Sequence, residues 1–191
     1  MNKTRRLTVS ALLSGLILLF GLTPVGLIPL GFINVTTLCL PVIIGTLIMG
    51  LKAGLLFGFM FGTVSLMSML GFGMTPPSTL ASNLFASLPL GAILMCYIPR
   101  LTVPVVAWLV YNSKESRIKF AAPAASFTNT VLYLGLMWAF YALAGLNTAP
   151  IVGLILGTGF LAGGAEALVA FLIVPPVTKA LNKFLQKGVT K

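Results

Sequence analysis

Apolar residues fill long blocks of this chain, and short stretches rich in glycine, proline or charged residues separate the blocks. A helix that crosses a bilayer needs about 20 predominantly apolar residues. At that length the chain has room for about five to seven spans and for no separate soluble domain. The pattern therefore predicts an all-α integral membrane protein with a single membrane domain over residues 1–191.

The blocks predict six transmembrane helices. They cover residues 7–22, 35–50, 53–70, 90–112, 120–143 and 151–174. The fourth helix contains Pro99 and Pro104, which membrane helices tolerate where neighbouring groups satisfy the freed carbonyls. Pro175–Pro176 is expected to end or bend the last helix, and a basic amphipathic tail, 175–191, follows. For residues 83–89 a loop, a short helix and the first turn of the fourth helix all stay open.

Positive charge follows the order of these helices. Lysines and arginines lie at both termini and in the second and fourth connections, whereas the first, third and fifth connections carry none. Such a bias in short loops orients a membrane protein with its basic side in the cytoplasm. Both termini are therefore expected in the cytoplasm of a multi-pass cell-membrane protein. The same bias explains the net charge of +10 without a nucleic-acid partner.

The composition excludes most catalytic chemistry. Only 7% of residues are charged, and the chain has no histidine, no aspartate and two glutamates, so a catalytic triad or a carboxylate cluster for metal is not available. No G-x-x-x-x-G-K-[ST] motif is present to hold ATP phosphates. We expect no enzyme activity, no metal and no cofactor bound by this chain. Transport would draw its energy from an ion gradient or a partner.

Small residues recur at four-residue spacing in three of the predicted helices, the last of which has Gly153 and Gly157. Gly54, Gly58 and Gly62 form one such stripe, and Ala11-x-x-x-Gly15, with Ser14 beside it, forms another. Small residues one turn apart let helix backbones approach closely. The glycine stripe is interpreted as packing within the chain. The stripe in the first helix serves either the same purpose or an interface with a separate protein.

Three polar residues lie deep in the predicted helices: Arg100, Asn129 and Glu166. With a rise of about 1.5 Å per residue, all three are roughly 15–20 Å from the inner ends of their helices. They therefore share one level near or above the membrane midplane. Tyr133 follows Asn129 by one turn on the same face of its helix. A small polar cluster in an apolar bundle is the expected form of a solute site.

A cation at the depth of Arg100 is costly and usually has a partner or a function. In one interpretation Arg100 and Glu166 neutralise each other, so that Glu166 is structural. In a second, Arg100 holds an anionic group of a substrate, with Asn129 and Tyr133 as hydrogen-bond partners. In a third, Arg100 snorkels toward the outer interface. Asn83, at an outer loop–helix junction, either reaches the same site or is an ordinary helix cap.

Beyond these patterns, the chain resembles a known family along nearly its whole length. The segments that carry the likeness are TRRLTVSALLSGLILL, VTTLCLPVIIGTLIMGLKAGLLFGFMFGTVSLM, IPRLTVPVVAWLVY, TNTVLYLGLMW and AEALVAFLIVPPVTKAL. Their order and spacing are similar to those of the substrate-binding S component of bacterial energy-coupling factor (ECF) transporters. Within that family the pattern resembles the pantothenate branch most, and the folate branch next.

The resemblance implies a vitamin receptor that takes its substrate from outside through the outer loops and the last three helices. It also implies partners: a transmembrane coupling protein and two ATPases that use the ATP. In the family, docking on this module uses an A-x-x-x-A motif in the first helix, which maps to Ala11, Ser14 and Gly15. Glycine in the second place of the motif departs from the pattern.

A stand-alone secondary transporter is the competing interpretation. Proton or sodium coupling usually relies on intramembrane carboxylates, and only Glu166 lies inside a predicted helix. That single carboxylate favours the S component over a transporter that works alone.

Overall fold

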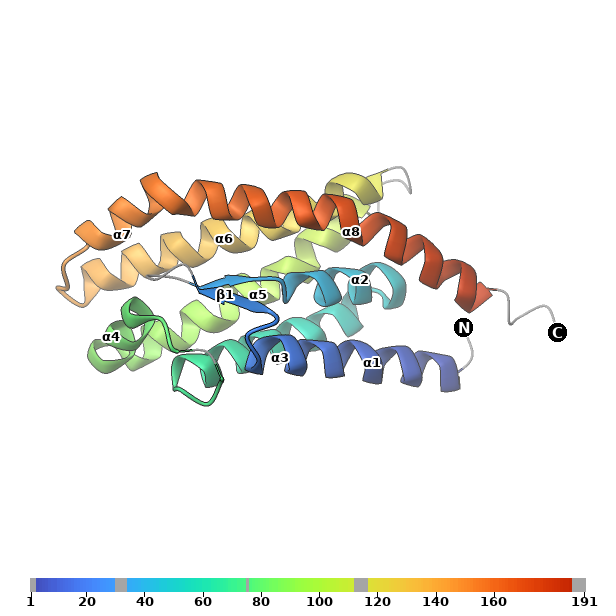
Figure 1. The fold of residues 1–191 in the computed structure, drawn as a ribbon, viewed down its shortest axis with the longest axis horizontal. Coiled ribbons are helices and arrows are strands. Elements are labelled where there is room, and N and C mark those ends of the chain that lie inside the picture. Colours follow the sequence, from blue (N-terminus) through green and yellow to red (C-terminus); the bar gives the residue numbers. More distant parts are fainter. Residues whose placement is uncertain (1–2, 30–33, 75, 112–116, 187–191) are drawn as a thin grey trace.

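A computed structural model describes residues 3–29, 34–74, 76–111 and 117–186, and most of them are helical (Figure 1). The elements in chain order are α1 (Lys3–Leu22), β1 (Leu27–Pro29), β2 (Asn34–Thr36), α2 (Cys39–Met49), α3 (Leu51–Met69), α4 (Thr79–Ser87), α5 (Pro89–Tyr111), α6 (Ile118–Leu143), α7 (Ala149–Leu154), a π-helical turn (Ile155–Gly159) and α8 (Phe160–Gln186). Along the bundle, α1 packs on α3, α3 on α5, α5 on α6 and α6 on α8.

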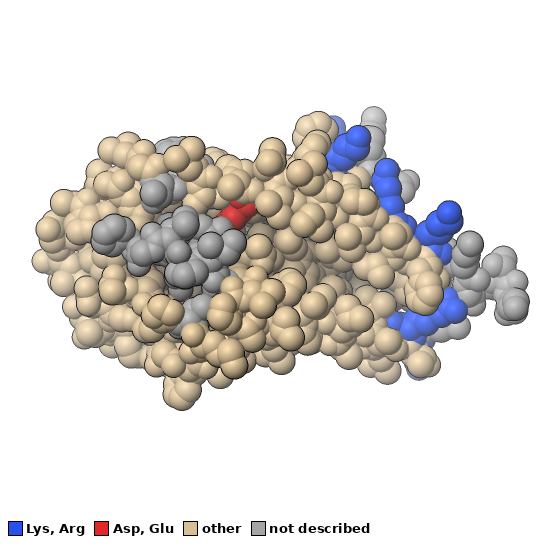
Figure 2. Space-filling model, in the orientation of Figure 1, with Lys and Arg blue, Asp and Glu red and all other residues tan. Residues whose placement is uncertain are grey.

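The first and last long helices meet at one end of the bundle (Figure 1). There the Arg5 guanidinium donates through Nη1 to the carbonyl oxygens of Phe184 and Leu185, at 3.5 and 3.4 Å, and lies 5.7 Å from the centroid of the Phe184 ring. In the face shown in Figure 2, lysine and arginine side chains gather at this end and are absent from the rest. The charges thus separate a basic end from an uncharged one.

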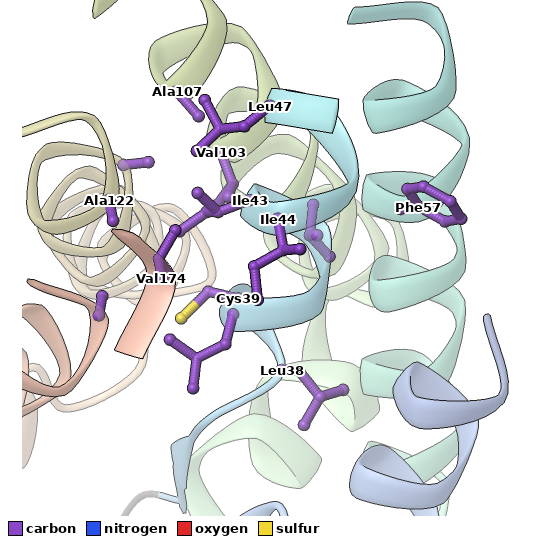
Figure 3. Close-up of a cluster of buried hydrophobic side chains, with 14 of the residues drawn as sticks. Leu38, Cys39, Ile43, Ile44, Leu47, Phe57, Val103, Ala107, Ala122 and Val174 are labelled. Atoms are coloured by element: carbon purple, nitrogen blue, oxygen red, sulfur yellow. The ribbon is translucent and has the colours of Figure 1, made fainter. Parts of the chain in front are cut away.

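Helix α2 lies inside the bundle and contacts α1, α3, α5, α6 and α8. Every residue from Cys39 to Leu47 is buried, as expected for a helix that is apolar on all sides. Around it, side chains from α1, α3, α5, α6 and α8 complete a hydrophobic core, part of which is drawn in Figure 3. The labelled members are Leu38, Cys39, Ile43, Ile44, Leu47, Phe57, Val103, Ala107, Ala122 and Val174.

The glycine stripe of α3 packs against α5, which confirms the prediction of packing within the chain. A β-carbon added at Gly58 would lie 2.7 Å from the carbonyl oxygen of Arg100, and one at Gly62 would lie 2.7 Å from the Tyr97 ring. A β-carbon at Gly54 would meet Thr46 and lie 2.9 Å from Pro104. The two backbones approach so closely because three successive turns of α3 lack side chains there.

In the ranges that the structure describes, four helices are long and apolar enough to cross a membrane: α1, α3, α5 and the Leu161–Leu185 part of α8. Helix α2 is apolar, but its 11 residues rise only about 16 Å, roughly half the hydrocarbon core. Helix α6 has 26 residues, but polar residues at 128–130 make it less apolar than those four. Four of the six predicted spans are therefore confirmed as helices long and apolar enough to cross, and the other two stay a prediction.

A β-hairpin replaces the start of the second predicted helix. Strands β1 and β2 pair antiparallel, with Leu27 opposite Thr36 and Pro29 opposite Asn34. The predicted helix 35–50 is wrong at its start. The all-α class is confirmed, because each strand of this hairpin has only three residues. β-branched residues at 35–37 favour extended backbone, and pairing with β1 satisfies their peptide groups.

The sixth predicted helix, 151–174, is also wrong at its end and in its continuity. A π-helical turn at Ile155–Gly159 separates α7 from α8, and α8 runs on to Gln186 with Pro175 and Pro176 inside it. The pair bends the helix rather than ending it, and Figure 1 shows α8 changing direction toward its end. Proline removes only two backbone donors, and good helix formers follow. Most of the predicted tail, 175–191, is thus helix, and 187–191 lie outside the described residues.

The remaining boundaries agree to within a few residues. Helix α1 begins at Lys3 rather than 7, and residue 112, the predicted end of the fourth helix, lies outside the described residues. The segment that was left open at 83–89 mostly belongs to the short helix α4. Gly50 has a φ of +86° in the turn between α2 and α3, a conformation that glycine adopts without strain.

Candidate functional site

A cavity of about 80 Å³ lies toward the uncharged end of the bundle. It is larger than the space that a single water needs. Its wall comes from the end of α1, from α3, α4, α5, α6 and α8, and from the residues before α2 and α4. The lining residues are Gly21, Leu38, Val64, Ser65, Ser68, Met69, Ser78, Ala81, Cys96, Arg100, Asn129, Thr130, Tyr133, Leu134, Ala162 and Glu166.

Arg100 is the cation of this cavity and is only 5% exposed. Its Nη1 donates to the carbonyl oxygen of Met95 at 3.1 Å. The guanidinium carbon lies 4.5 Å from the centroid of the Tyr133 ring and 5.3 Å from that of Phe61. Cation–π contacts of this kind stabilise a desolvated guanidinium. The Nε atom is buried and has no hydrogen-bond partner among the described residues.

Asn129 faces the same cavity from α6 and is 5% exposed. Its Oδ1 atom is buried and, among the described residues, accepts no hydrogen bond. An unsatisfied buried polar atom costs about 1–3 kcal/mol. A polar ligand that paired with Asn129 and with Arg100 Nε would remove both penalties.

Glu166 reaches the cavity from α8 and accepts a hydrogen bond from Thr130 Oγ1 at 3.0 Å. The idea that Arg100 and Glu166 neutralise each other stays a prediction, since both line one cavity. Snorkelling would require the head group of Arg100 at the interface, whereas this side chain is buried.

The structure brings Arg100, Asn129, Tyr133 and Glu166 to one cavity, as their depths predicted. Asn83 is not among the lining residues. It lies on the exposed surface of α4, and that helix contributes an alanine to the wall instead.

Several polar lining residues escaped the sequence reading. Thr130 adjoins Asn129 in a Thr-Asn-Thr run, and Ser65 and Ser68 are three residues apart on α3. The spacing of the serines is a signal that they share a face. Cys96, one turn before Arg100 on α5, also lines the cavity. No group of three or more His, Cys, Asp or Glu suited to a metal occurs in the described ranges.

The small residues of α1 lie apart from this cavity. Ala11 and Gly15 are exposed and Ser14 is half-buried. A β-carbon added at Gly15 would meet no atom within 4 Å. Leu12, between them, is 59% exposed. This face of α1 is open, while Leu13 and Ile17 on the other side enter the core.

Comparison with known proteins supplies the family. The chain matches the model of the ECF transporter, substrate-specific component, over residues 5–178. It is also 31% identical over 161 residues to the pantothenic acid transporter PanT of Lactococcus lactis subsp. cremoris (strain MG1363), covering 77% of this chain and 79% of that protein.

The resemblance inferred from the five sequence segments is thereby confirmed. The family match and four apolar helices also make this a multi-pass bacterial membrane protein. Its family is one of transporter subunits, not of enzymes. The matched region contains nearly all of α1, α2 to α6 complete and every residue that lines the cavity, and the chain belongs to the family of substrate-specific components of ECF transporters.

Proposed function

We propose that this chain is the pantothenate-binding subunit of an ECF-type vitamin importer. The observation that carries the proposal is the buried Arg100, whose Nε is unpartnered among the described residues and which lines a cavity beside the unpaired Oδ1 of Asn129. A buried guanidinium with a free donor suits a carboxylate, and pantothenate carries one. The likeness to a pantothenic acid transporter points to the same vitamin.

The other polar groups suit the rest of the vitamin. Pantothenate also has an amide and two hydroxyls, which act as donors and acceptors. In the proposal Asn129 and Tyr133 hydrogen-bond to these groups. The Thr130–Glu166 pair offers acceptor oxygens for the hydroxyls of the vitamin. In this arrangement α5 binds the carboxylate of the vitamin, and α6 and α8 bind its amide and hydroxyl groups.

Folate is the alternative vitamin, and a stand-alone secondary transporter is the alternative class. Folate carries two carboxylates, and a single arginine suits a singly charged ligand better. A secondary transporter would need ionisable residues along a path, and Glu166 is the only carboxylate inside the predicted helices. Both alternatives predict results that differ in the binding test below.

The arrangement in the membrane follows from the same proposal. The chain crosses six times, with α6 as one further span and α2 together with the strand before it as the other. The basic end faces the cytoplasm, so the cavity opens toward the outer side. A coupling protein and two ATPases supply the energy, and the open face of α1 with Ala11, Ser14 and Gly15 docks on them.

Arg100→Ala tests the proposal directly. We expect the detergent-purified wild type to bind pantothenate in calorimetry and the variant to bind at least about 30-fold more weakly, because truncating one partner of a buried charge pair costs about 2–5 kcal/mol. Arg117→Ala is the matched control, since Arg117 is exposed at the start of α6, and it should bind as the wild type does.

Thermal unfolding without ligand checks that Arg100→Ala remains folded. An unchanged Kd in a folded Arg100→Ala protein would contradict the role given to Arg100. A wild type that bound folate and not pantothenate would favour the alternative vitamin. Solute uptake by the purified chain alone, driven by an ion gradient, would contradict the proposal that partner ATPases supply the energy.

A further inference from the structure

Two prolines interrupt the backbone hydrogen bonding of α5 on either side of Arg100. Within an α-helix, each backbone N–H donates to the carbonyl four residues earlier. Pro99 has no N–H, so the carbonyl of Met95 lacks its ordinary partner. Pro104 leaves the carbonyl of Arg100 itself in the same condition. Both prolines lie inside the helix.

The carbonyl that Pro99 leaves free is the one that holds Arg100. Nη1 of Arg100 donates to Met95 O at 3.1 Å. A helical side chain points toward the N-terminus of its helix, so the arginine at 100 extends back along the turn where this carbonyl lies. In an uninterrupted helix that oxygen would already accept the N–H of residue 99.

We propose that Pro99 is a positioning residue for substrate binding: it keeps the Met95 carbonyl available to orient the Arg100 guanidinium toward a carboxylate. The inference rests on the proposed function for its ligand. Nη1 is held by the backbone, the rings of Phe61 and Tyr133 lie against the guanidinium, and Nε has no partner among the described residues. A group oriented before binding loses less conformational freedom when the ligand arrives.

Pro99→Ala is the test, because alanine restores an N–H that competes for Met95 O. The measurement is the ratio of affinities for pantothenate and for panthenol, a neutral analogue in which an alcohol replaces the carboxylate. We expect the wild type to prefer pantothenate and the variant to lose about three- to tenfold of that preference, the worth of one hydrogen bond. A general loosening of the site would weaken both ligands equally and leave the ratio unchanged.

Pro104→Ala is the matched control in the same helix. It also restores a backbone donor in α5, but it leaves the Met95 carbonyl free, and residue 104 does not line the cavity. Its pantothenate-to-panthenol ratio should equal that of the wild type. A ratio that stays at the wild-type value in Pro99→Ala, or that falls equally in both variants, overturns the inference.

A ligand-free measurement separates this inference from the proposed function. In a double-mutant cycle of Pro99→Ala and Arg100→Met, melting temperatures should be non-additive, because both changes act on the Met95 carbonyl. Pro104→Ala and Arg100→Met should give a smaller coupling. Additive shifts with Pro99→Ala would overturn the positioning role. If the coupling were present but the protein bound no pantothenate, the Pro99–Met95–Arg100 contact would be supported and the proposed function would be contradicted.

Discussion

The small-residue stripes of α3 and α1 look alike in the sequence and lie in opposite surroundings. On α3, Gly58 is buried, and a β-carbon there would collide with the Arg100 carbonyl. On α1, Gly15 is exposed, and a β-carbon there would meet nothing within 4 Å. The α3 stripe is therefore part of the fold. The α1 stripe contributes little to the fold and lies on an open face of the helix.

The difference shows what a small-residue stripe does and does not determine. Such a stripe permits close helix contact, but it does not say whether the partner is another helix of the chain. In α3 the partner is the helix that carries Arg100, so the stripe also sets the position of the candidate binding site. In α1 the proposed partner is the coupling protein.

The largest effect is expected for Gly58→Leu, which inserts a side chain where α3 and α5 touch. The backbone oxygen 2.7 Å away cannot rotate aside as a flexible side chain can. Overpacking of this kind costs about 3 kcal/mol, so we expect a markedly lower melting temperature in detergent, together with weaker pantothenate binding. Gly15→Leu is the matched control and should melt as the wild type does. Equal melting temperatures for the two variants would contradict the conclusion that only the α3 stripe is part of the fold.

Next in size is the effect of Ala11→Leu and Gly15→Leu on assembly. Both add bulk to the open face of α1, so they should block co-purification with the coupling protein and the two ATPases and abolish vitamin uptake. Pantothenate binding by the isolated subunit should be unchanged, because neither residue lines the cavity. Uptake at the wild-type rate in both variants would remove this face as the docking surface.

The smallest effect is expected for Arg5→Ala. This variant tests how much the Arg5 contact contributes to holding α1, one face of which is open, against the bundle. Arg5 joins the start of α1 to the carbonyls at the end of α8. Its hydrogen bonds are long and partly exposed, so their loss should cost at most about 1 kcal/mol and lower the melting temperature by a few degrees. Arg6→Ala, at an exposed neighbouring position, is the control. A drop as large as that of Gly58→Leu would mean that the Arg5 contact, rather than the core face of α1, holds this helix.

Sequence reading placed Arg100, Asn129 and Glu166 at one depth, and the structure brings all three to one cavity. Depth was predictable because the rise of a helix per residue is constant and the basic ends mark one side. The same sequence pattern left Asn83 open between the site and a helix cap, and it did not single out Thr130, Ser65 and Ser68. Whether a side chain at this depth reaches the cavity depends on the rotation of its helix about the helix axis. Depth alone does not give that rotation.

The amino-acid sequence by itself determined the apolar blocks, the basic end, the family and the level of the polar residues. Only the tertiary structure decided that α2 lies inside the bundle, that residues 27–36 contain a paired hairpin and that Pro99 leaves a carbonyl for Arg100. The physical reason is the solvent. Lipid tails are as apolar as leucine, so outward-facing and inward-facing positions have the same composition, and the rotation of each helix is set by its neighbours.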